Sequence, residues 1–367
     1  MSKKIRIIGA VLVAILWLGV CLFAWLQPAK AASTSERRPL EQFPALNTET
    51  LLNGKFMTDF EDYTLDQFPA RDTFRKIKAM FHYNVLGQKD NNGIIFYNGY
   101  AAQMEYPLNE TSISYATKKF TTLYDKYLKD TGSDIYVTLV PDKGYYLPEN
   151  AGYLTMDYEK LFALMQDGMP YAQFIDITGD LSLEDYYYTD THWRQESILD
   201  AANTLCQAMG VTGPKAEDYS IVTPEQPFYG VYYGQAALPM EPESLSYLQS
   251  AWLNQCIVTN HETGKTGKVY DLSKLSGNDL YEVFLSGPVS LLTIENPRAA
   301  TDKELIIFRD SFGSSIAPLL IQDYATVTLV DIRYLNSAFL DKFVDFHGQD
   351  VLFLYSTLVL NNSSTLK

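Results

Sequence analysis

The sequence predicts an α/β protein with a mostly parallel sheet covered by helices on both faces, a β-rich insertion and an N-terminal membrane helix. Three observations predict this class. Short apolar strands alternate with amphipathic helices along most of the chain. A long uncharged apolar run lies near the N-terminus. Residues 211 to 300 interrupt the alternation with short β-like runs and frequent Gly, Pro and Tyr.

Length and composition limit the classes of function. The chain has 367 residues, 47% of them hydrophobic, which is enough to bury one large core or two modest ones. A formal charge of −15 argues against nucleic-acid binding, which needs clustered cations, and disfavours contact with anionic lipid. Cys206 and Cys256 either form a disulfide or remain buried thiols, and their spacing does not decide between the two.

The first 31 residues predict export. Three cations, at Lys3, Lys4 and Arg6, precede an uncharged run from Ile7 to Leu26. As a helix this run spans about 30 Å, the hydrocarbon thickness of a bilayer. Removed signal peptides have shorter apolar cores, so we expect an uncleaved single-pass anchor with the rest of the chain on the extracytoplasmic side. The triplet 29–31, Ala-Lys-Ala, also fits a cleavage site, and cleavage near Ala31 releases a secreted protein.

The next segments lead into the domain. Residues 32–56 are polar and contain two prolines, which predicts a linker to a domain over 57–367. Helical periodicity on both sides of Pro69 predicts two helices within 60–87. One face of the second helix holds Phe74, Ile77, Met80 and Phe81. The turn signals of NNGIIFYNG predict a β-hairpin at 91–99.

The rest of the domain alternates between strands and helices. The strands are short and apolar, and we expect them at 134–141, 171–178, 303–308, 325–332 and 350–356. The helices between them are expected near 113–130, 156–168, 194–210 and 313–322. The insertion at 211–300 has β-like runs at 228–234 and 285–294. This order predicts a mostly parallel sheet with both faces covered.

FRDSFGSS, residues 308–315, is a first candidate for chemistry. An apolar strand ends here, and Ser311 falls in the turn before a helix that begins around Gly313. Ligands bind at the carboxyl ends of strands in such sheets, and free N–H groups at a helix N-terminus can bind a developing oxyanion. The alternative is that Asp310 or Ser311 only caps the helix. Ser314 and Ser315 are rival hydroxyls, but they fall inside the first helical turn.

YYYTDTHWRQES, residues 186–197, is the second candidate. In an extended segment the side chains of Asp190 and His192 point the same way, so the carboxylate can fix the imidazole tautomer. The alternative is a surface aspartate and a histidine that caps the next helix. His82, His261 and His347 show no ligand spacing, so we expect neither a metal nor another cofactor.

Both candidates follow a strand and precede a helix, which places them at the same edge of the sheet. Ser311 is then a nucleophile, His192 a general base and Asp190 its orienting acid. Four further residues reach this edge and are candidates for substrate binding: Arg333, Lys143, Tyr145 and Trp193. Structural roles compete with these assignments, because Arg333 can pair with Asp331 or Asp310, and Trp193 can be a core anchor.

Several segments together resemble the DHHW protein family and the related SGNH-like alginate O-acetyltransferases. They occur in family order, at 66–74, 91–99, 139–150, 188–193, 309–315 and 330–334. Those proteins have a permuted SGNH-hydrolase order, with Asp and His before Ser. The namesake motif usually has a second histidine where this chain has Thr191, which affects the subfamily but leaves Asp190 and His192 in place.

The resemblance implies a permuted SGNH-like fold and an extracytoplasmic O-acetyltransferase that acts on a polysaccharide or another cell-envelope glycan. Such proteins often work beside a membrane-bound O-acyltransferase that delivers acyl groups. The carried-over roles are Ser311 as nucleophile, His192 as general base and acid, and Asp190 as its orienter, in a ping-pong reaction. Two alternatives stay open: a carbohydrate acetyl esterase with the same triad, and a non-catalytic glycan-binding partner.

Overall fold

The computed structural model describes residues 3–367, and they form two compact units. The first unit contains the chain up to Asn91 together with Tyr233–Pro239. The second contains Asn92–Tyr232 and Met240–Lys367. The boundaries predicted from the sequence, with a linker over 32–56 and a domain over 57–367, stay a prediction.

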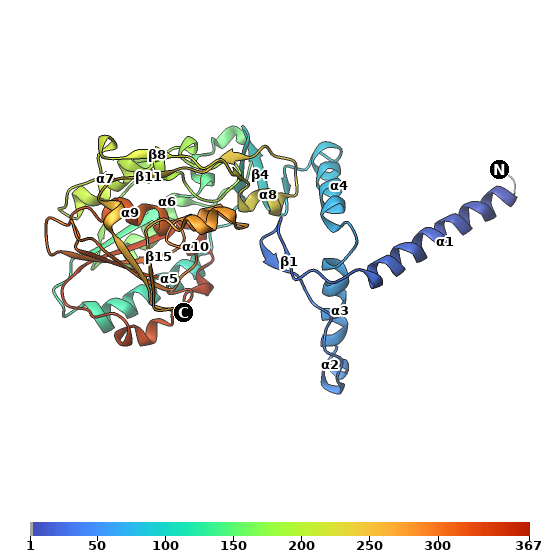
Figure 1. Ribbon diagram of the computed structural model, residues 1–367, viewed down its shortest axis with the longest axis horizontal. Coiled ribbons are helices and arrows are strands. Elements are labelled where there is room, and N and C mark those ends of the chain that lie inside the picture. The colour runs from blue at the N-terminus through green and yellow to red at the C-terminus, as the bar shows by residue number, and fades with distance from the viewer. Residues whose placement is uncertain (1–2) are drawn as a thin grey trace. The chain divides into compact units, whose positions relative to one another are not determined.

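The first unit is mostly helical, with one short antiparallel pair of strands, β1 (Ala32–Ser33) and β2 (Arg38–Pro39) (Figure 1). Its helices are α1 (Lys3–Leu26), α2 (Thr48–Leu52), α3 (Lys55–Asp66) and α4 (Arg71–Asn84). Residues 4–26 of α1 are long and apolar enough to cross a membrane by length and composition. The two helices predicted around Pro69 are confirmed as α3 and α4. The segment 233–239 is held within this unit, because Arg75 donates to the carbonyl of Gly234 (2.9 Å) and Asn91 to that of Ala236 (2.6 Å).

The second unit contains an eight-stranded sheet in the order β13-β12-β14-β16-β15-β17-β6-β7. The five strands from β16 to β7 are parallel to one another, and β14, β12 and β13 extend the sheet in antiparallel pairs. The predicted mixed α/β class with a mostly parallel sheet is confirmed. The strands are β6 (Ile135–Val140), β7 (Gln173–Phe174), β12 (Ile257–Asn260), β13 (Lys265–Gly267), β14 (Leu291–Glu295), β15 (Glu304–Arg309), β16 (Thr326–Val330) and β17 (Asp350–Ser356).

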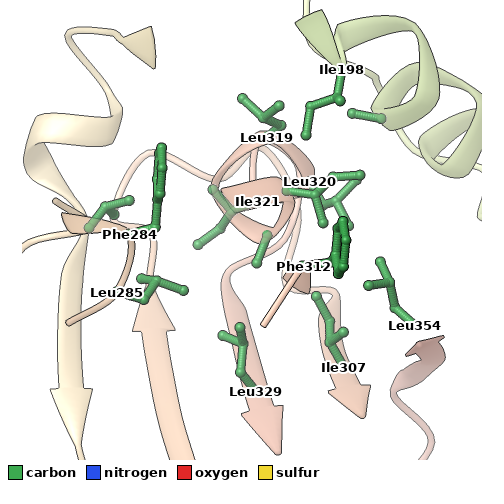
Figure 2. Packing of buried hydrophobic residues seen from close by; sticks show 14 of the residues in the cluster. Ile198, Phe284, Leu285, Ile307, Phe312, Leu319, Leu320, Ile321, Leu329 and Leu354 are labelled. Carbon is green, nitrogen blue, oxygen red and sulfur yellow. The ribbon is translucent and has the colours of Figure 1, made fainter. Parts of the chain in front are cut away.

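Helices cover both faces of this sheet. Along β15 the side chains alternate between two cores, with Leu305 and Ile307 in one and Ile306 and Phe308 in the other. The first core includes α7 (Leu199–Ala208) and α9 (Gly313–Leu320), and Figure 2 shows Ile307 and its neighbours under α9. The second includes α5 (Glu110–Leu123), α6 (Tyr158–Gly168) and α10 (Thr357–Asn361).

Some local predictions fail where tertiary contacts decide the structure. The strand predicted at 171–178 pairs only at Gln173–Phe174, because β7 is a short edge strand. The run at 228–234 continues into a helix, α8 (Val231–Ala236), instead of a strand. The helix predicted at 194–210 begins only at Leu199, after a 3-10 turn at Gln195–Ser197.

The predicted hairpin is present, displaced toward the C-terminus. Strands β4 (Ile94–Tyr97) and β5 (Tyr100–Gln103) pair antiparallel around Asn98-Gly99. Both turn residues have positive φ, 47° and 89°, as a two-residue hairpin turn with the right-handed strand twist requires. Asparagine tolerates this conformation and glycine adopts it without steric cost.

Candidate active site

Buried aromatic residues hold the two ends of the loop that carries Asp190 and His192. It lies between β7 and α7, where Tyr186 bridges to Trp193 and the N–H of Tyr187 donates to the carbonyl of His192 (3.1 Å). Tyr186, Tyr187 and Trp193 are fully buried. These three aromatic residues therefore fix the ends of the loop, and Asp190 and His192 lie near its tip.

Three side chains meet in a hydrogen-bonded row. Nδ1 of His192 lies 2.6 Å from Oδ1 of Asp190, and its Nε2 lies 2.7 Å from Oγ of Ser311. A carboxylate only accepts hydrogen bonds, so Nδ1 carries the proton and Nε2 accepts from the serine hydroxyl. Asp190 is buried, while 12% of the His192 side chain is exposed. This is the arrangement in which an imidazole can take the proton of a nucleophile.

The imidazole ring is also fixed from its face. Tyr281 stacks on His192 with ring centroids 3.8 Å apart and an interplanar angle of 8°. The Tyr281 hydroxyl is 2.7 Å from Oγ of Ser315, and that oxygen accepts from Nε1 of Trp193 (2.8 Å). Phe312 lies against the imidazole at 4.9 Å. The ring therefore has little freedom to turn away from Ser311.

The turn that carries Ser311 is tied to the neighbouring strand. Asp310 is fully buried and accepts from the N–H of Phe312 (3.0 Å) and from that of Ser356 at the end of β17 (2.7 Å). Gly313 begins α9 directly over the side chain of Arg309, whose Cβ is 2.7 Å from where a Cβ of residue 313 would lie. Glycine therefore allows the close passage of the helix over the strand end.

The supply of oxyanion donors differs from the expectation. The N–H groups of Phe312, Gly313 and Ser314 already have acceptors within the turn, at Asp310 and Ser311. Within residues 3–367 the structure gives no acceptor for the N–H of Ser311 itself. One backbone donor beside the nucleophile is thus available for a developing negative charge.

Gly230 and Val231 hold Asp190 and its neighbour Thr189 from the other side, and the sequence did not indicate this. The N–H of Val231 donates to Oδ2 of Asp190 (2.8 Å), and that of Gly230 to Oγ1 of Thr189 (2.7 Å). A Cβ at residue 230 would lie 2.3 Å from the backbone of Asp190, so only glycine fits there. Each oxygen of Asp190 therefore has its own donor, His192 on one side and Val231 on the other.

Glu243 fixes the backbone just before Asp190. Its carboxylate accepts from the N–H of Tyr188 (2.8 Å), the N–H and hydroxyl of Thr189 (both 2.7 Å) and the guanidinium of Arg194 (3.1 Å). Its side chain is 7% exposed. We call Glu243, Gly230 and Val231 the loop clamp, because together they hold residues 188–190.

Replacing Glu243 with glutamine is expected to lower kcat by about 10- to 100-fold, as loss of an outer supporting partner does at other sites, with little change in KM. The amide turns a donor toward N–H and O–H donors and so costs stability of about 1–3 kcal/mol. The exposed neighbour Glu241 offers the matched control, and Glu241→Gln should leave both quantities unchanged. Steady-state kinetics and urea unfolding of both variants check this. Equal effects of the two substitutions contradict a positioning role.

The four other candidate residues have structural contacts. Trp193 is fully buried and presents no ring face to a sugar, so the structure favours its core interpretation. Arg333 forms the ion pair with Asp331 (2.6 Å), with 17% of its side chain exposed. Tyr145 is half-buried and lines a hollow of about 320 Å³. Lys143 is 2% exposed and donates to the carbonyl of Tyr187 (2.8 Å), so it supports the loop and does not reach solvent.

Lys143 gives a testable pH dependence. Burial lowers the pKa of Lys143 to about 7 from its ordinary 10.5, against the opposing attraction of Asp190 and Glu243. Between these values the unfolded chain binds a proton that the folded chain does not, so this group makes unfolding free energy rise with pH. Urea unfolding of the wild type and of Lys143→Met at pH 7 and pH 9 should show the wild type gaining stability relative to the variant at the higher pH. A pH-independent difference contradicts the assignment.

The departure from the DHHW pattern has a local structural role. Oγ1 of Thr191 is 3.0 Å from the hydroxyl of Tyr232. Thr191 thus adds a contact between the loop tip and Tyr232, the residue after the clamp residue Val231. The row of Asp190, His192 and Ser311 does not include Thr191.

No family model and no curated protein matches this sequence. Among solved structures, a DHHW family protein from Eubacterium siraeum is similar with a TM-score of 0.62 at 19% identity, over 76% of this chain and 95% of that one. Bacillus cereus PatB1, in a structure with a sulfonyl adduct, gives 0.59 at 17% identity over 73% and 95%. The O-acetyltransferase domain of Pseudomonas putida AlgJ gives 0.44 at 13% identity over 73% and 92%. The resemblance to the DHHW proteins is thus confirmed at the level of the fold.

Proposed function

We propose that this chain is an O-acetyltransferase that carries an acetyl group on Ser311 and passes it to a hydroxyl of a cell-envelope or secreted polysaccharide. The observation that carries the proposal is the row of Ser311, His192 and Asp190, with 2.7 Å and 2.6 Å between the bonded atoms. The sequence motifs shared with the alginate O-acetyltransferases support acetyl as the group and a glycan as the acceptor. A permuted SGNH-like catalytic domain is part of the same proposal.

The first half-reaction loads the serine. Oγ of Ser311 attacks the carbonyl carbon of the acetyl donor while Nε2 of His192 takes the hydroxyl proton. The negative charge on the carbonyl oxygen faces the N–H of Ser311. When the bond to the leaving group breaks, His192 returns the proton to that group, and acetyl-Ser311 remains.

The second half-reaction reverses these roles. A sugar hydroxyl gives its proton to Nε2 of His192 as its oxygen attacks the acetyl carbonyl. The bond to Oγ of Ser311 breaks, and the proton returns to that oxygen. Asp190 stays ionised throughout and stabilises the imidazolium. Attack by water at the same point makes the chain an acetyl esterase, and that choice depends on the acceptor.

The location of the chain belongs to this proposal. The apolar helix α1 acts as a single-pass anchor, and the cations at Lys4 and Arg6 keep the N-terminus in the cytoplasm. The second unit then works on the extracytoplasmic side, beside a membrane-bound O-acyltransferase that delivers acetyl groups. Removal of α1 near Ala31 is the alternative, and it yields a secreted enzyme.

Intact-protein mass spectrometry after exposure to p-nitrophenyl acetate tests the chemistry. The expected result is one added acetyl group, which peptide mapping assigns to Ser311. Oligosaccharide acceptors should then speed the loss of this group and yield acetylated sugar. Release of acetate alone, with or without sugar, favours the esterase. No adduct on the folded protein overturns both enzyme assignments and leaves the non-catalytic binding role.

A further inference from the structure

One face of α4 is apolar. Phe74, Ile77 and Phe81 recur along it at helical spacing, and Val85 continues this spacing directly after the helix ends. These side chains are 57%, 57%, 50% and 66% exposed. Ala79, on the other side of the helix, is fully buried. The sequence predicts a common face for Phe74, Ile77, Met80 and Phe81 and indicates no partner for it. We call Phe74, Ile77, Phe81 and Val85 the α4 stripe. Among the described residues of the first unit, none buries these four side chains.

The start of α4 is tied to the end of the apolar helix α1. Gln67, four residues before α4, donates to the carbonyl of Lys30 (2.9 Å) and accepts from its N–H (2.8 Å). Gln27, the residue after α1, donates to the carbonyl of Gln67 (2.6 Å). In the last turn of α1, Trp25 lies 6.4 Å from the ring of Phe60 in α3. The junction of α3 and α4 therefore lies at the level where α1 ends.

This level is the membrane surface if α1 spans the bilayer. Its apolar run fills the hydrocarbon thickness, so Trp25 occupies the interfacial region that tryptophan prefers. In Figure 1, α1 leaves the row of α2, α3 and α4 at a large angle. A helix in that row, starting at the membrane surface, runs along the surface and not away from it. Such a position suits an amphipathic helix with exposed phenylalanines.

The charges of this part of the chain also fit. α4 carries four Lys and Arg residues and one Asp, and both Lys76 and Lys78 are exposed. Residues 27–91 contain nine cations and nine anions, while residues 92–367 contain 17 cations and 35 anions. The negative excess of the whole chain therefore lies outside this surface. The expectation that acidity keeps the protein off anionic lipid applies to the second unit alone.

We infer that the α4 stripe binds the outer surface of the phospholipid bilayer from which α1 emerges. The first unit is then held by two contacts, the spanning helix and a helix lying in the interface. This inference rests on the anchor role of α1 and is independent of the acetyl-transfer chemistry.

The test uses the full chain in nanodiscs, with Cys21→Ser so that only an introduced cysteine reacts, because Cys206 and Cys256 are buried. One variant carries an NBD fluorophore at Ile77→Cys, in the stripe. The matched control carries it at Asp72→Cys, on the opposite side of α4, where the side chain is 52% exposed. Discs contain phosphatidylcholine with brominated acyl chains, with or without phosphatidylglycerol. Both positions are exposed, so circular dichroism of the labelled variants should match the unlabelled chain.

The expected result is that brominated lipid quenches the Ile77 label several-fold more than the Asp72 label, while aqueous iodide shows the reverse order. Phosphatidylglycerol should keep or strengthen this difference, because α4 is cationic. Equal access of iodide to both labels overturns the inference. A different outcome also overturns the inference: in discs that hold two copies of the chain, and only in those, neither brominated lipid nor iodide quenches the Ile77 label. That result assigns the stripe to contact with a second copy of the chain. Neither outcome bears on acetylation of Ser311.

Discussion

Replacing Ser311 with alanine is expected to abolish the acetyl-enzyme and to lower kcat/KM by about 10⁴- to 10⁶-fold. The Ser311 hydroxyl is the functional group of this side chain, and it donates a hydrogen bond to Nε2 of His192. Its removal leaves no attacking oxygen for the base to activate. The fold should remain intact, because losing one partly exposed hydrogen bond costs about 1 kcal/mol. Mass spectrometry after exposure to an acetyl ester, together with the unfolding curve, measures both effects.

The neighbouring serine provides the control for that variant. Oγ of Ser314 is buried and 3.1 Å from the guanidinium of Arg309, on a different side of the turn. Ser314→Ala should therefore still acquire acetyl at Ser311, at the cost of some stability. Acetylation that persists at the active site of Ser311→Ala, or that disappears only in Ser314→Ala, shows that the nucleophile has been assigned to the wrong hydroxyl.

The second large effect is expected for Asp190→Asn, with kcat/KM about 10³- to 10⁴-fold lower. The amide has one oxygen and one NH₂ group where the carboxylate has two acceptors. If the oxygen faces His192, the NH₂ group opposes the N–H of Val231. If it faces Val231, the NH₂ group opposes Nδ1 of His192 and favours the tautomer that cannot accept the serine proton. Each orientation therefore damages either the clamp or the base.

The measurement separates this loss from a general loss of folding. The exposed Asp200 supplies the matched substitution, and Asp200→Asn should keep full activity. For Asp190→Asn, steady-state kinetics should show the loss of kcat/KM while the circular dichroism spectrum stays native. Activity within tenfold of the wild type contradicts the orienting role of Asp190.

The parallel part of the sheet and the row of three side chains could be predicted from the sequence for one reason. Strands β6, β15, β16 and β17 are nearly continuous apolar runs, as strands buried on both faces must be. Parallel strands end at one edge, so polar residues that follow two of them converge there. The pairing of Ser311 with His192 follows from that geometry. The partners of these residues in the substrate do not.

The loop clamp could not be predicted from the sequence, because its residues lie far from Asp190 along the chain and carry no periodic signal. The three clamp residues, and Tyr281 that stacks on His192, lie in the region 211–300, which the pattern described only as largely β. A single glutamate between Pro242 and Ser244 shows nothing that identifies its four donors. Likewise, the spacing of Phe74, Ile77 and Phe81 indicates a common face but not whether that face is buried or exposed.

The segment 233–239 has a practical consequence for anyone who prepares a soluble form of this protein. It connects Val231 to Glu243 along the chain, and two of its carbonyls, those of Gly234 and Ala236, accept hydrogen bonds from Arg75 and Asn91. A fragment that starts at residue 92 lacks Arg75 and Asn91. Residues 233–239 then lose these hydrogen bonds, although they connect Val231 and Glu243, which hold Asp190 and the residues before it. A fragment that starts near residue 32 removes the apolar helix α1 and retains Arg75 and Asn91, so it is the better choice for crystallisation and for kinetic measurements.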